Sequence, residues 1–147
     1  QGVSCRITTV QYPDDAFAID ESPVAGLHVL HAPGYLGMRQ LIAGGDLPDA
    51  VMCRSDTMAQ GVLRACEEAG ITVPGQIAVT GFDDEPASSA GWMPLTSVGL
   101  PLEEMIRPAV EELAGLVRGE LQPRDHISLV RGKVVIRHSS RKKSQGA

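Results

Sequence analysis

Short apolar runs and helical apolar stripes alternate in the middle of this 147-residue chain. Residues 50–53 form an apolar run that is too short for a helix, and residues 77–80 form a second one. Between them, apolar residues recur at helical spacing at Ala59, Val62, Leu63, Cys66 and Ala69. Gly70 and Pro74 follow this stripe and end the helix. The pattern predicts a strand–helix–strand unit with two parallel strands over residues 47–84.

The flanking segments continue the alternation. Helical spacing also marks residues 35–43, and further strands are predicted at residues 6–11, 95–100, 126–130 and 133–137. A long apolar stripe follows residue 100, at Leu102, Met105, Ile106, Ala109, Val110, Leu113, Leu116 and Val117. Because an interior proline costs about 3 kcal/mol, Pro108 favours a helix that begins near Arg107. Strands alternating with helices predict an α/β domain.

Polar side chains follow both strands of the predicted unit. Ser55 and Asp56 come after the first strand, and Asp83 and Asp84 come after the second. Ligands bind beyond the carboxyl ends of the strands in open parallel sheets, and carboxylate and hydroxyl groups suit polyols. Ser55 and Asp83 are therefore candidates for one shared site. The structural alternative has equal weight: Ser55 or Asp56 caps the helix, and the two aspartates shape a turn.

A series of motifs connects the chain to a known family. It contains PDAV, SDTMAQGVLRACEEAGITVP, IAVTGFDD, LTSV and VVIRHSS, in this order between about Gly34 and Ser140. Together these motifs resemble the LacI/GalR family of transcriptional regulators. The resemblance implies a periplasmic-binding-protein type I-like α/β subdomain, with a three-layer parallel sheet flanked by helices. In that family two such subdomains close around a small effector and follow a helix-turn-helix DNA-binding domain.

The resemblance also divides the chain into parts. Residues 1–99 correspond to the C-terminal subdomain of the sensor, incomplete at its start. Residues 100–125 correspond to a helix of the opposing subdomain, and residues 126–147 to the final strands and a basic tail. The rest of the opposing subdomain and the DNA-binding domain are expected outside this chain. Any contact with DNA is therefore expected only through a domain that the chain lacks.

The effector implied by the resemblance is a small polar metabolite, sugar-like or nucleoside-like. Asp83 is the expected hydroxyl acceptor, and Ser55 is the next candidate. Phe17 is the nearest match to an aromatic residue that stacks on the effector, although it suits the core equally well. The family commonly has Asn where this chain has Ser55, and its effector-binding Arg has no counterpart before Ile7. These departures predict a different effector preference and weak binding by half a cleft.

Family members form dimers through this subdomain, so the resemblance implies a homodimer. The interface is expected on the outer face of the helix after Ser55 and in the segment after the GFDD motif. The residues predicted there are Gln60, Leu63, Arg64 and Trp92. Trp92 is the only tryptophan of the chain, and it is equally suited to core packing.

Composition limits the other functions. The formal net charge is −5, and Lys and Arg cluster only in the last residues, which argues against nucleic-acid binding by this chain itself. No apolar run approaches the ~20 residues of a membrane span. Cys5, Cys53 and Cys66 fit neither a disulfide framework nor a zinc site. We therefore expect reduced thiols, no metal, no cofactor, no membrane contact and a cytoplasmic location.

Motifs of common enzyme classes do not occur in the sequence. It lacks a Gly-x-Ser-x-Gly elbow, a Gly-x-Gly-x-x-Gly loop, a phosphate-binding Gly-Lys-Ser or Gly-Lys-Thr, and His-Glu-x-x-His. We therefore expect a protein that is not an enzyme. The alternative function is that of a periplasmic sugar-binding component of a transporter, which shares the fold. The three free cysteines and the VVIRHSS ending argue against it.

Overall fold

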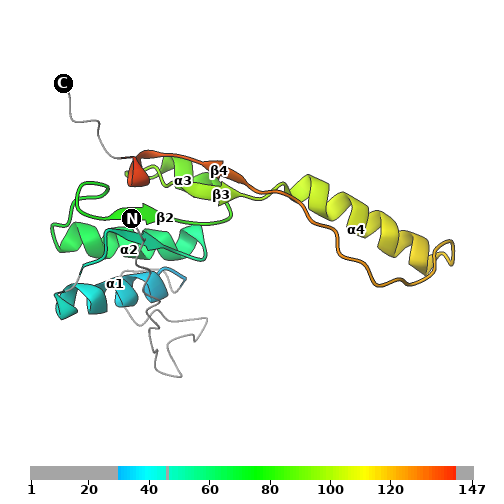
Figure 1. Ribbon diagram of the computed structural model, residues 1–147, viewed down its shortest axis with the longest axis horizontal. Coiled ribbons are helices and arrows are strands. Elements are labelled where there is room, and N and C mark those ends of the chain that lie inside the picture. Colours follow the sequence, from blue (N-terminus) through cyan, green and yellow to red (C-terminus); the bar gives the residue numbers. More distant parts are fainter. Residues whose placement is uncertain (1–29, 46, 142–147) are drawn as a thin grey trace, which may run out of the picture.

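The computed structural model describes residues 30–45 and 47–141, in which helices alternate with short strands (Figure 1). The helices are α1 (Ala32–Gly44), α2 (Asp56–Glu68), α3 (Pro86–Ala90) and α4 (Leu102–Val117). The strands are β1 (Ala50–Met52), β2 (Ala78–Thr80), β3 (Ser97–Gly99) and β4 (Lys133–Val135), and a 3-10 helix η1 (His138–Ser140) follows. The predicted α/β class is confirmed. The strand predicted at residues 6–11 lies outside the described residues.

Two strand pairs, β1–β2 and β3–β4, lie side by side and are linked by an isolated bridge. Val51 of β1 is opposite Val79 of β2 in a parallel pair, as the strand–helix–strand pattern predicted. A parallel bridge between Thr80 and Thr96 continues the arrangement to β3. β4 pairs with β3 in the antiparallel direction, because the chain returns along β3 after its excursion through α4. The sheet is therefore parallel in its first part and antiparallel at its last strand.

Helix α1 packs closely on α2 because glycines stand where the two helices cross. A Cβ atom on Gly34 would lie 1.9 Å from the carbonyl oxygen of Met58, and one on Gly61 would lie 2.0 Å from that of His31. Both neighbours are backbone atoms, so a side chain could not be accommodated by a rotamer change. The absence of Cβ atoms thus lets the two backbones touch, and α2 lies between α1 and the strands (Figure 1).

The core lies between α2 and the sheet. Burial raises the pKa of Cys53 to about 12 and that of Cys66 to about 11, and both are free thiols packed among apolar side chains. Val51 also packs on this core, whereas Met52, on the other face of β1, is 87% exposed. The described helices therefore cover one face of β1. The fully buried apolar side chains include Met38, Leu63, Ile77, Val79 and Leu95.

Helix α4 projects away from the sheet, and it begins earlier than the sequence predicted (Figure 1). Pro108 lies inside the helix, so the expected start near Arg107 is wrong. The first turn forms before the proline, where Met105 N donates to Pro101 O over 3.1 Å and Arg107 pairs with Glu103. The proline thus removes one internal donor without ending the helix.

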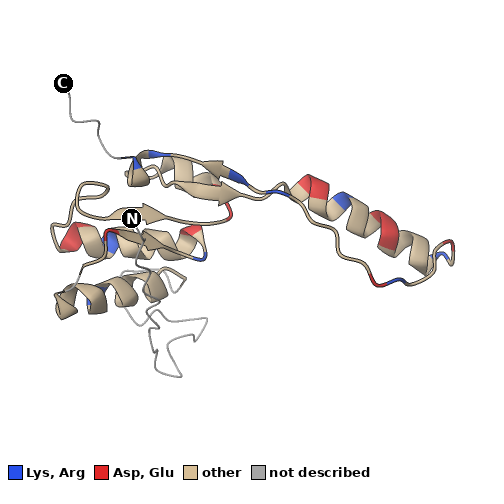
Figure 2. Cartoon of the chain, in the orientation of Figure 1, with Lys and Arg blue, Asp and Glu red and all other residues tan. Residues whose placement is uncertain are grey.

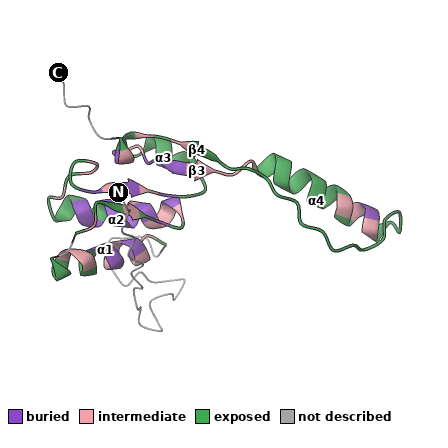
Figure 3. Ribbon diagram, in the orientation of Figure 1, coloured by how far each residue is buried: buried purple, intermediate pink, exposed green. Residues whose placement is uncertain are grey.

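Most of the apolar stripe of α4 is exposed, and most of the ribbon of this helix is green in Figure 3. The returning segment 126–130, predicted as a strand, has no regular structure. Ile127 and Leu129 in this segment are 87% and 92% exposed, and a strand needs a neighbour for its backbone hydrogen bonds. Within the described ranges, no helix combines the length and apolar character needed to cross a membrane. Exposed on α4 are Leu102, Met105, Ile106, Val110, Leu113 and Val117.

Candidate functional site

Two loops meet at the carboxyl edge of β1 and β2. Cys53 N donates to Thr80 O over 2.8 Å, and Asp56 N donates to Phe82 O over 2.8 Å. These bonds hold the start of α2 against the loop that follows β2. The polar segments after the two strands are therefore neighbours, as expected for a parallel pair.

Ser55 is the N-cap of α2. Its backbone is extended, with φ −151° and ψ 159°, and its Oγ accepts a hydrogen bond from Met58 N at 3.2 Å. Ser55 is therefore a helix cap, as the structural alternative predicted. Because the hydroxyl accepts this bond, its own proton remains available for donation, and the side chain is only half-buried. Ser55 can therefore cap the helix and still donate to a ligand.

Asp83 and Asp84 form a left-handed turn after β2. Their φ angles are +97° and +53°, a region that non-glycine residues seldom occupy and that concentrates at functional sites. Asp83 N donates to Val98 O over 3.0 Å, while the residue itself is exposed. Its carboxylate makes no hydrogen bond or ion pair with the described part of the chain. Asp83 thus presents a carboxylate without a partner in the described chain at this edge. Figure 2 shows in red the acidic stretch of residues 83–85 in the loop after β2.

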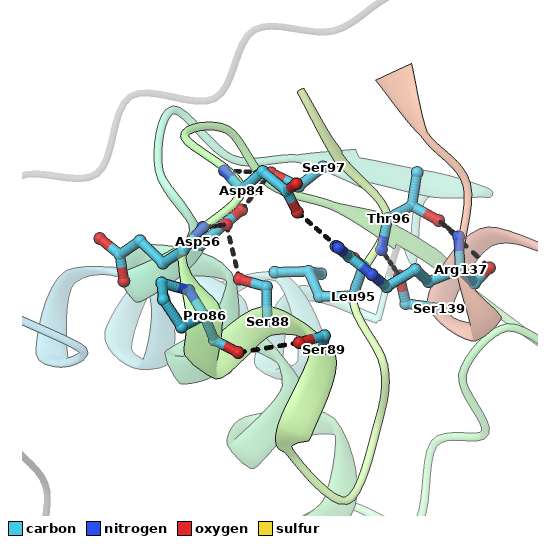
Figure 4. Close-up of polar contacts among 11 residues, drawn as sticks. Asp56, Asp84, Pro86, Ser88, Ser89, Leu95, Thr96, Ser97, Arg137 and Ser139 are labelled. Carbon is cyan, nitrogen blue, oxygen red and sulfur yellow. Dashed lines mark hydrogen bonds and ion pairs between the residues drawn. The ribbon is translucent and has the colours of Figure 1, made fainter. Parts of the chain in front are cut away.

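Asp84 has a partner of opposite charge. Its Oδ1 is buried and lies 2.6 Å from Nη2 of Arg137, a residue of the segment that returns after β4 (Figure 4). The contact is an ion pair without the alignment of a hydrogen bond. Asp84 N also donates to Ser97 Oγ over 3.1 Å. The second aspartate of the pair is therefore fixed by the fold, in contrast to Asp83.

Asp56 is the buried centre of the site. Asp56 is only 1% exposed. Its Oδ2 accepts hydrogen bonds from Glu85 N at 2.8 Å and from Ser88 Oγ at 2.5 Å. Oδ1 accepts from Ser97 Oγ at 2.6 Å (Figure 4). One carboxylate thus connects α2, α3 and β3. From the sequence, Asp56 was predicted only as a possible helix cap, and its position directly after Ser55 was the available signal.

Gly81 makes room for that carboxylate. A Cβ atom at this position would lie 2.1 Å from Asp56 Oδ1. The glycine of the GFDD motif is therefore required by contact with Asp56. No group of three His, Cys, Asp or Glu side chains within residues 30–45 and 47–141 could hold a metal ion.

The predicted interface residues lie in different environments. Leu63 is wholly buried in the core, so its assignment to the outer face of the helix is wrong; it lies on the side of α2 that faces the sheet and α1. Arg64 is exposed and its Nε donates to Glu68 over 2.7 Å, and Gln60 is half-buried. Trp92 is 59% exposed, which argues against core packing. Phe17, the predicted stacking residue, lies outside the described residues.

Surface charges around α1 and α2 form a small network. Tyr35 OH donates to Glu68 Oε2 over 2.6 Å, and Arg64 approaches the other oxygen. These hydrogen bonds, first from Tyr35 and then from Arg64, lower the pKa of Glu68. The bond to Glu68 in turn raises the pKa of Tyr35. Two helices are thereby connected at the surface as well as through the glycines.

Comparison with known proteins relates this geometry to a family. Residues 3–140 match the family described as periplasmic binding protein-like domain. The chain is 38% identical over 96 residues to the HTH-type transcriptional repressor MelR of Bacillus subtilis. The aligned region covers 65% of this chain and 28% of that protein. The chain thus spans about a quarter of that repressor.

Solved structures of LacI-type regulators are similar to this chain in fold and in sequence. The lac repressor dimer bound to operator and the anti-inducer ONPF superimposes with a TM-score of 0.67 and 27% identity, over 78% of this chain and 34% of that one. A LacI family transcriptional regulator from Lactobacillus casei with bound sucrose gives a TM-score of 0.62 and 32% identity, over 77% and 41%. The chain belongs to the periplasmic binding protein-like domain family and, within it, to the sensor domains of LacI/GalR-type transcriptional regulators.

Proposed function

We propose that this chain is the effector-binding and dimerising part of a LacI-type regulator that senses a small polar metabolite, preferably a sugar. The main support for the proposal is the exposed carboxylate of Asp83 on a left-handed turn, at the same edge of the strand pair as the half-buried residue Ser55. Both lie at the carboxyl edge of a parallel pair, the usual ligand position in such sheets. The match to the periplasmic binding protein-like domain family supports a ligand-binding role for the chain.

The chemistry of these two groups favours a polyhydroxylated effector. An ionised carboxylate only accepts hydrogen bonds, and its two oxygens can accept from two adjacent hydroxyls. Ser55 Oγ already accepts a hydrogen bond from Met58 N, so its hydroxyl proton can be donated to a ring or hydroxyl oxygen of the effector. A sugar offers both kinds of partner at short spacing, and the relative from Lactobacillus casei holds sucrose. A nucleoside, through its ribose, is the second class that fits.

Regulation follows from differential binding. An effector that contacts this edge and the opposing subdomain stabilises one arrangement of the two over another. The affinity of the DNA-binding domain then changes by the same coupling free energy. In this scheme the protein acts in the cytoplasm, and DNA is bound only by a domain outside this chain.

Dimerisation is assigned to the surface of α2 and the segment after α3. Arg64 and Trp92 are exposed there, and the half-buried Gln60 lies on the same helix as Arg64. Tryptophan and arginine are the residue types that most often anchor protein interfaces. Leu63 supports this surface from within the core and is not part of it.

A titration followed by NMR tests the effector proposal. Labelled chain is titrated with sucrose, lactose, galactose, ribose and adenosine up to about 50 mM, because a few hydrogen bonds from half a cleft give a millimolar Kd. We expect saturable shifts at the amides of Ser55 and Asp83 with at least one of these compounds. Asp83→Asn should remove the saturable response while leaving the unfolding free energy within about 0.5 kcal/mol.

The matched control is Asp49→Asn. Asp49 is also an exposed aspartate, but it precedes β1 at the opposite edge of the sheet. This variant should bind like the unaltered chain. Shifts that saturate away from Ser55 and Asp83, or binding that survives Asp83→Asn, would contradict the proposed site. No saturable shift with any compound of the panel would count against a sugar or nucleoside effector.

A further inference from the structure

Arg137 makes two side-chain contacts to different parts of the sheet. Its Nη1 donates to Leu95 O over 2.8 Å, and its Nη2 lies 2.6 Å from Asp84 Oδ1 (Figure 4). The side chains of Arg137 and Asp84 are mostly buried, with 17% and 25% of their surfaces exposed, respectively. The guanidinium therefore joins the start of β3 to the turn after β2.

The backbone of Arg137 is anchored independently of this side chain. Arg137 N donates to Thr96 Oγ1 over 2.8 Å, and Thr96 Oγ1 donates to Arg137 O over 3.2 Å. Two residues later, Ser139 Oγ donates to Val79 O over 2.6 Å and accepts from Thr96 N at 2.9 Å. The returning segment would thus stay docked without the guanidinium, which makes the side-chain contacts separable from the docking.

The turn that Arg137 reaches needs outside support. Asp83 and Asp84 both have positive φ, and neither is a glycine, so the turn is held by its surroundings. Asp84 is held at its nitrogen by Ser97 and at its carboxylate by Arg137. Asp83 is held only at its nitrogen, by Val98 O. The conformation of Asp83 therefore depends on its neighbour.

We propose that Arg137 is a positioning residue for Asp83: by pairing with Asp84 it keeps the turn left-handed and so sets the direction of the carboxylate that receives the effector. The inference rests on the proposed function for the role of Asp83. It goes beyond that function by giving the effector site a support from the segment that returns after α4. The position of that segment and the conformation of the site are thereby connected through one ion pair.

The experiment compares two neutral variants with a control from the same segment. Arg137→Gln keeps a donor for the Leu95 carbonyl and removes the charge that faces Asp84. Arg137→Met keeps the length of the side chain and removes both. Ser139→Ala removes two buried hydrogen bonds of the same segment without touching Asp84. Urea unfolding measures the stability of each.

The readout is the intraresidue cross-peak between the amide proton and Hα in an NMR NOE spectrum, which is strong when φ is positive. We expect Asp83 and Asp84 to show strong cross-peaks in the unaltered chain and in Ser139→Ala, although the latter is destabilised. In Arg137→Gln and Arg137→Met these cross-peaks should weaken to those of ordinary residues. Arg137→Lys, which retains the charge, should restore them.

Effector binding provides the second readout. For a sugar that binds the unaltered chain, Arg137→Gln should weaken binding about tenfold, and Ser139→Ala should not. Strong cross-peaks at Asp83 in both neutral variants would overturn the positioning role, as would an equal loss of affinity in Ser139→Ala. Unfolding of both neutral variants would also overturn it, because Arg137 would then support the whole domain. If no sugar binds the unaltered chain, the effector assignment fails, while the cross-peaks still decide whether Arg137 holds the turn.

Discussion

Replacement of Asp56 with asparagine should destabilise the chain by about 4 kcal/mol, because one buried carboxylate accepts three hydrogen bonds that an amide cannot all accept. The donors are Ser88 Oγ at 2.5 Å, Glu85 N at 2.8 Å and Ser97 Oγ at 2.6 Å. They come from α3, from the loop before it and from β3. The substitution keeps the shape of the side chain, so it tests the charge and the acceptors alone.

The magnitude follows from the change in each bond. A hydrogen bond to a charged group contributes roughly 1.5–3 kcal/mol and a neutral one roughly 0.5–1.5 kcal/mol, so the two bonds that the amide oxygen can keep weaken by about 2 kcal/mol together. The third donor faces the amide nitrogen, and the loss of its bond to a charged acceptor adds about 2 kcal/mol. Water cannot compensate easily, because Asp56 is 1% exposed and even a Cβ on Gly81 would lie 2.1 Å from Oδ1.

Urea unfolding followed by circular dichroism measures this loss. With an m value of about 2 kcal/mol per molar, the midpoint should fall by roughly 2 M. Asp49→Asn, at an exposed position before β1, should change the unfolding free energy by less than about 0.5 kcal/mol. A loss below about 1 kcal/mol for Asp56→Asn at unchanged m would refute the reasoning. Ser88→Ala in the same background should add little, since its partner is already weakened.

Three further outcomes are expected. Gly61→Ala should destabilise by at least about 2 kcal/mol in urea unfolding, because its Cβ meets backbone, whereas Gly44→Ala, with open space around it, should be neutral or stabilising. Cys53 and Cys66 should remain unlabelled by a thiol reagent at pH 8 in peptide mapping. Burial raises the pKa values of both thiols above the ordinary 9.0, so the folded state favours the neutral thiols. Their contribution to the free energy of unfolding is therefore full below pH 9 and is lost as the pH rises through about 11 to 12. Leu113→Glu, at a position 61% exposed in the apolar stripe of α4, should reduce the association that an exposed apolar stripe promotes apart from the dimer surface of α2, as measured by analytical ultracentrifugation, and should leave stability within about 0.5 kcal/mol.

The middle of the fold could be predicted from local pattern. The helical stripe at Ala59, Val62 and Cys66 is the face of α2 that is buried in the structure. The two short apolar runs became β1 and β2, paired in parallel as their connection requires. In these elements the periodicity of the sequence and the packing of the fold give the same answer, so single-sequence reasoning succeeds.

Elements that depend on distant partners were predicted less well. Residues 126–130 have strand-like composition, but no described strand lies beside them, and the backbone stays irregular. Helix α4 extends through Pro108 because helical bonds form on both sides of the proline. Leu63 was placed on the outer face from the family resemblance, although its apolar spacing on α2 had already indicated the core face on which it lies. For residues 126–130 and for Pro108, local propensity did not contain the information needed.

The site shows the same division. The location of the candidate site was inferred from the residues after two strands, whereas Arg137 was present only as one residue of the VVIRHSS motif. Asp56 was noted only as a cap. The contacts of both residues join segments far apart in the sequence, and no spacing rule relates them. The motif VVIRHSS marked the position of Arg137 without indicating its partner.

Three aspartates at one edge of the sheet have different environments, and this difference selects the candidate effector acceptor. Asp56 is buried and accepts three hydrogen bonds, and Asp84 is paired with Arg137. Both carboxylates are engaged by the fold, so their replacement should lower stability or disturb the turn. Asp83 alone among these three has an exposed side chain without a partner in the described chain. Its replacement should therefore cost binding without costing stability, and this separation is the property expected of a residue kept for its ligand.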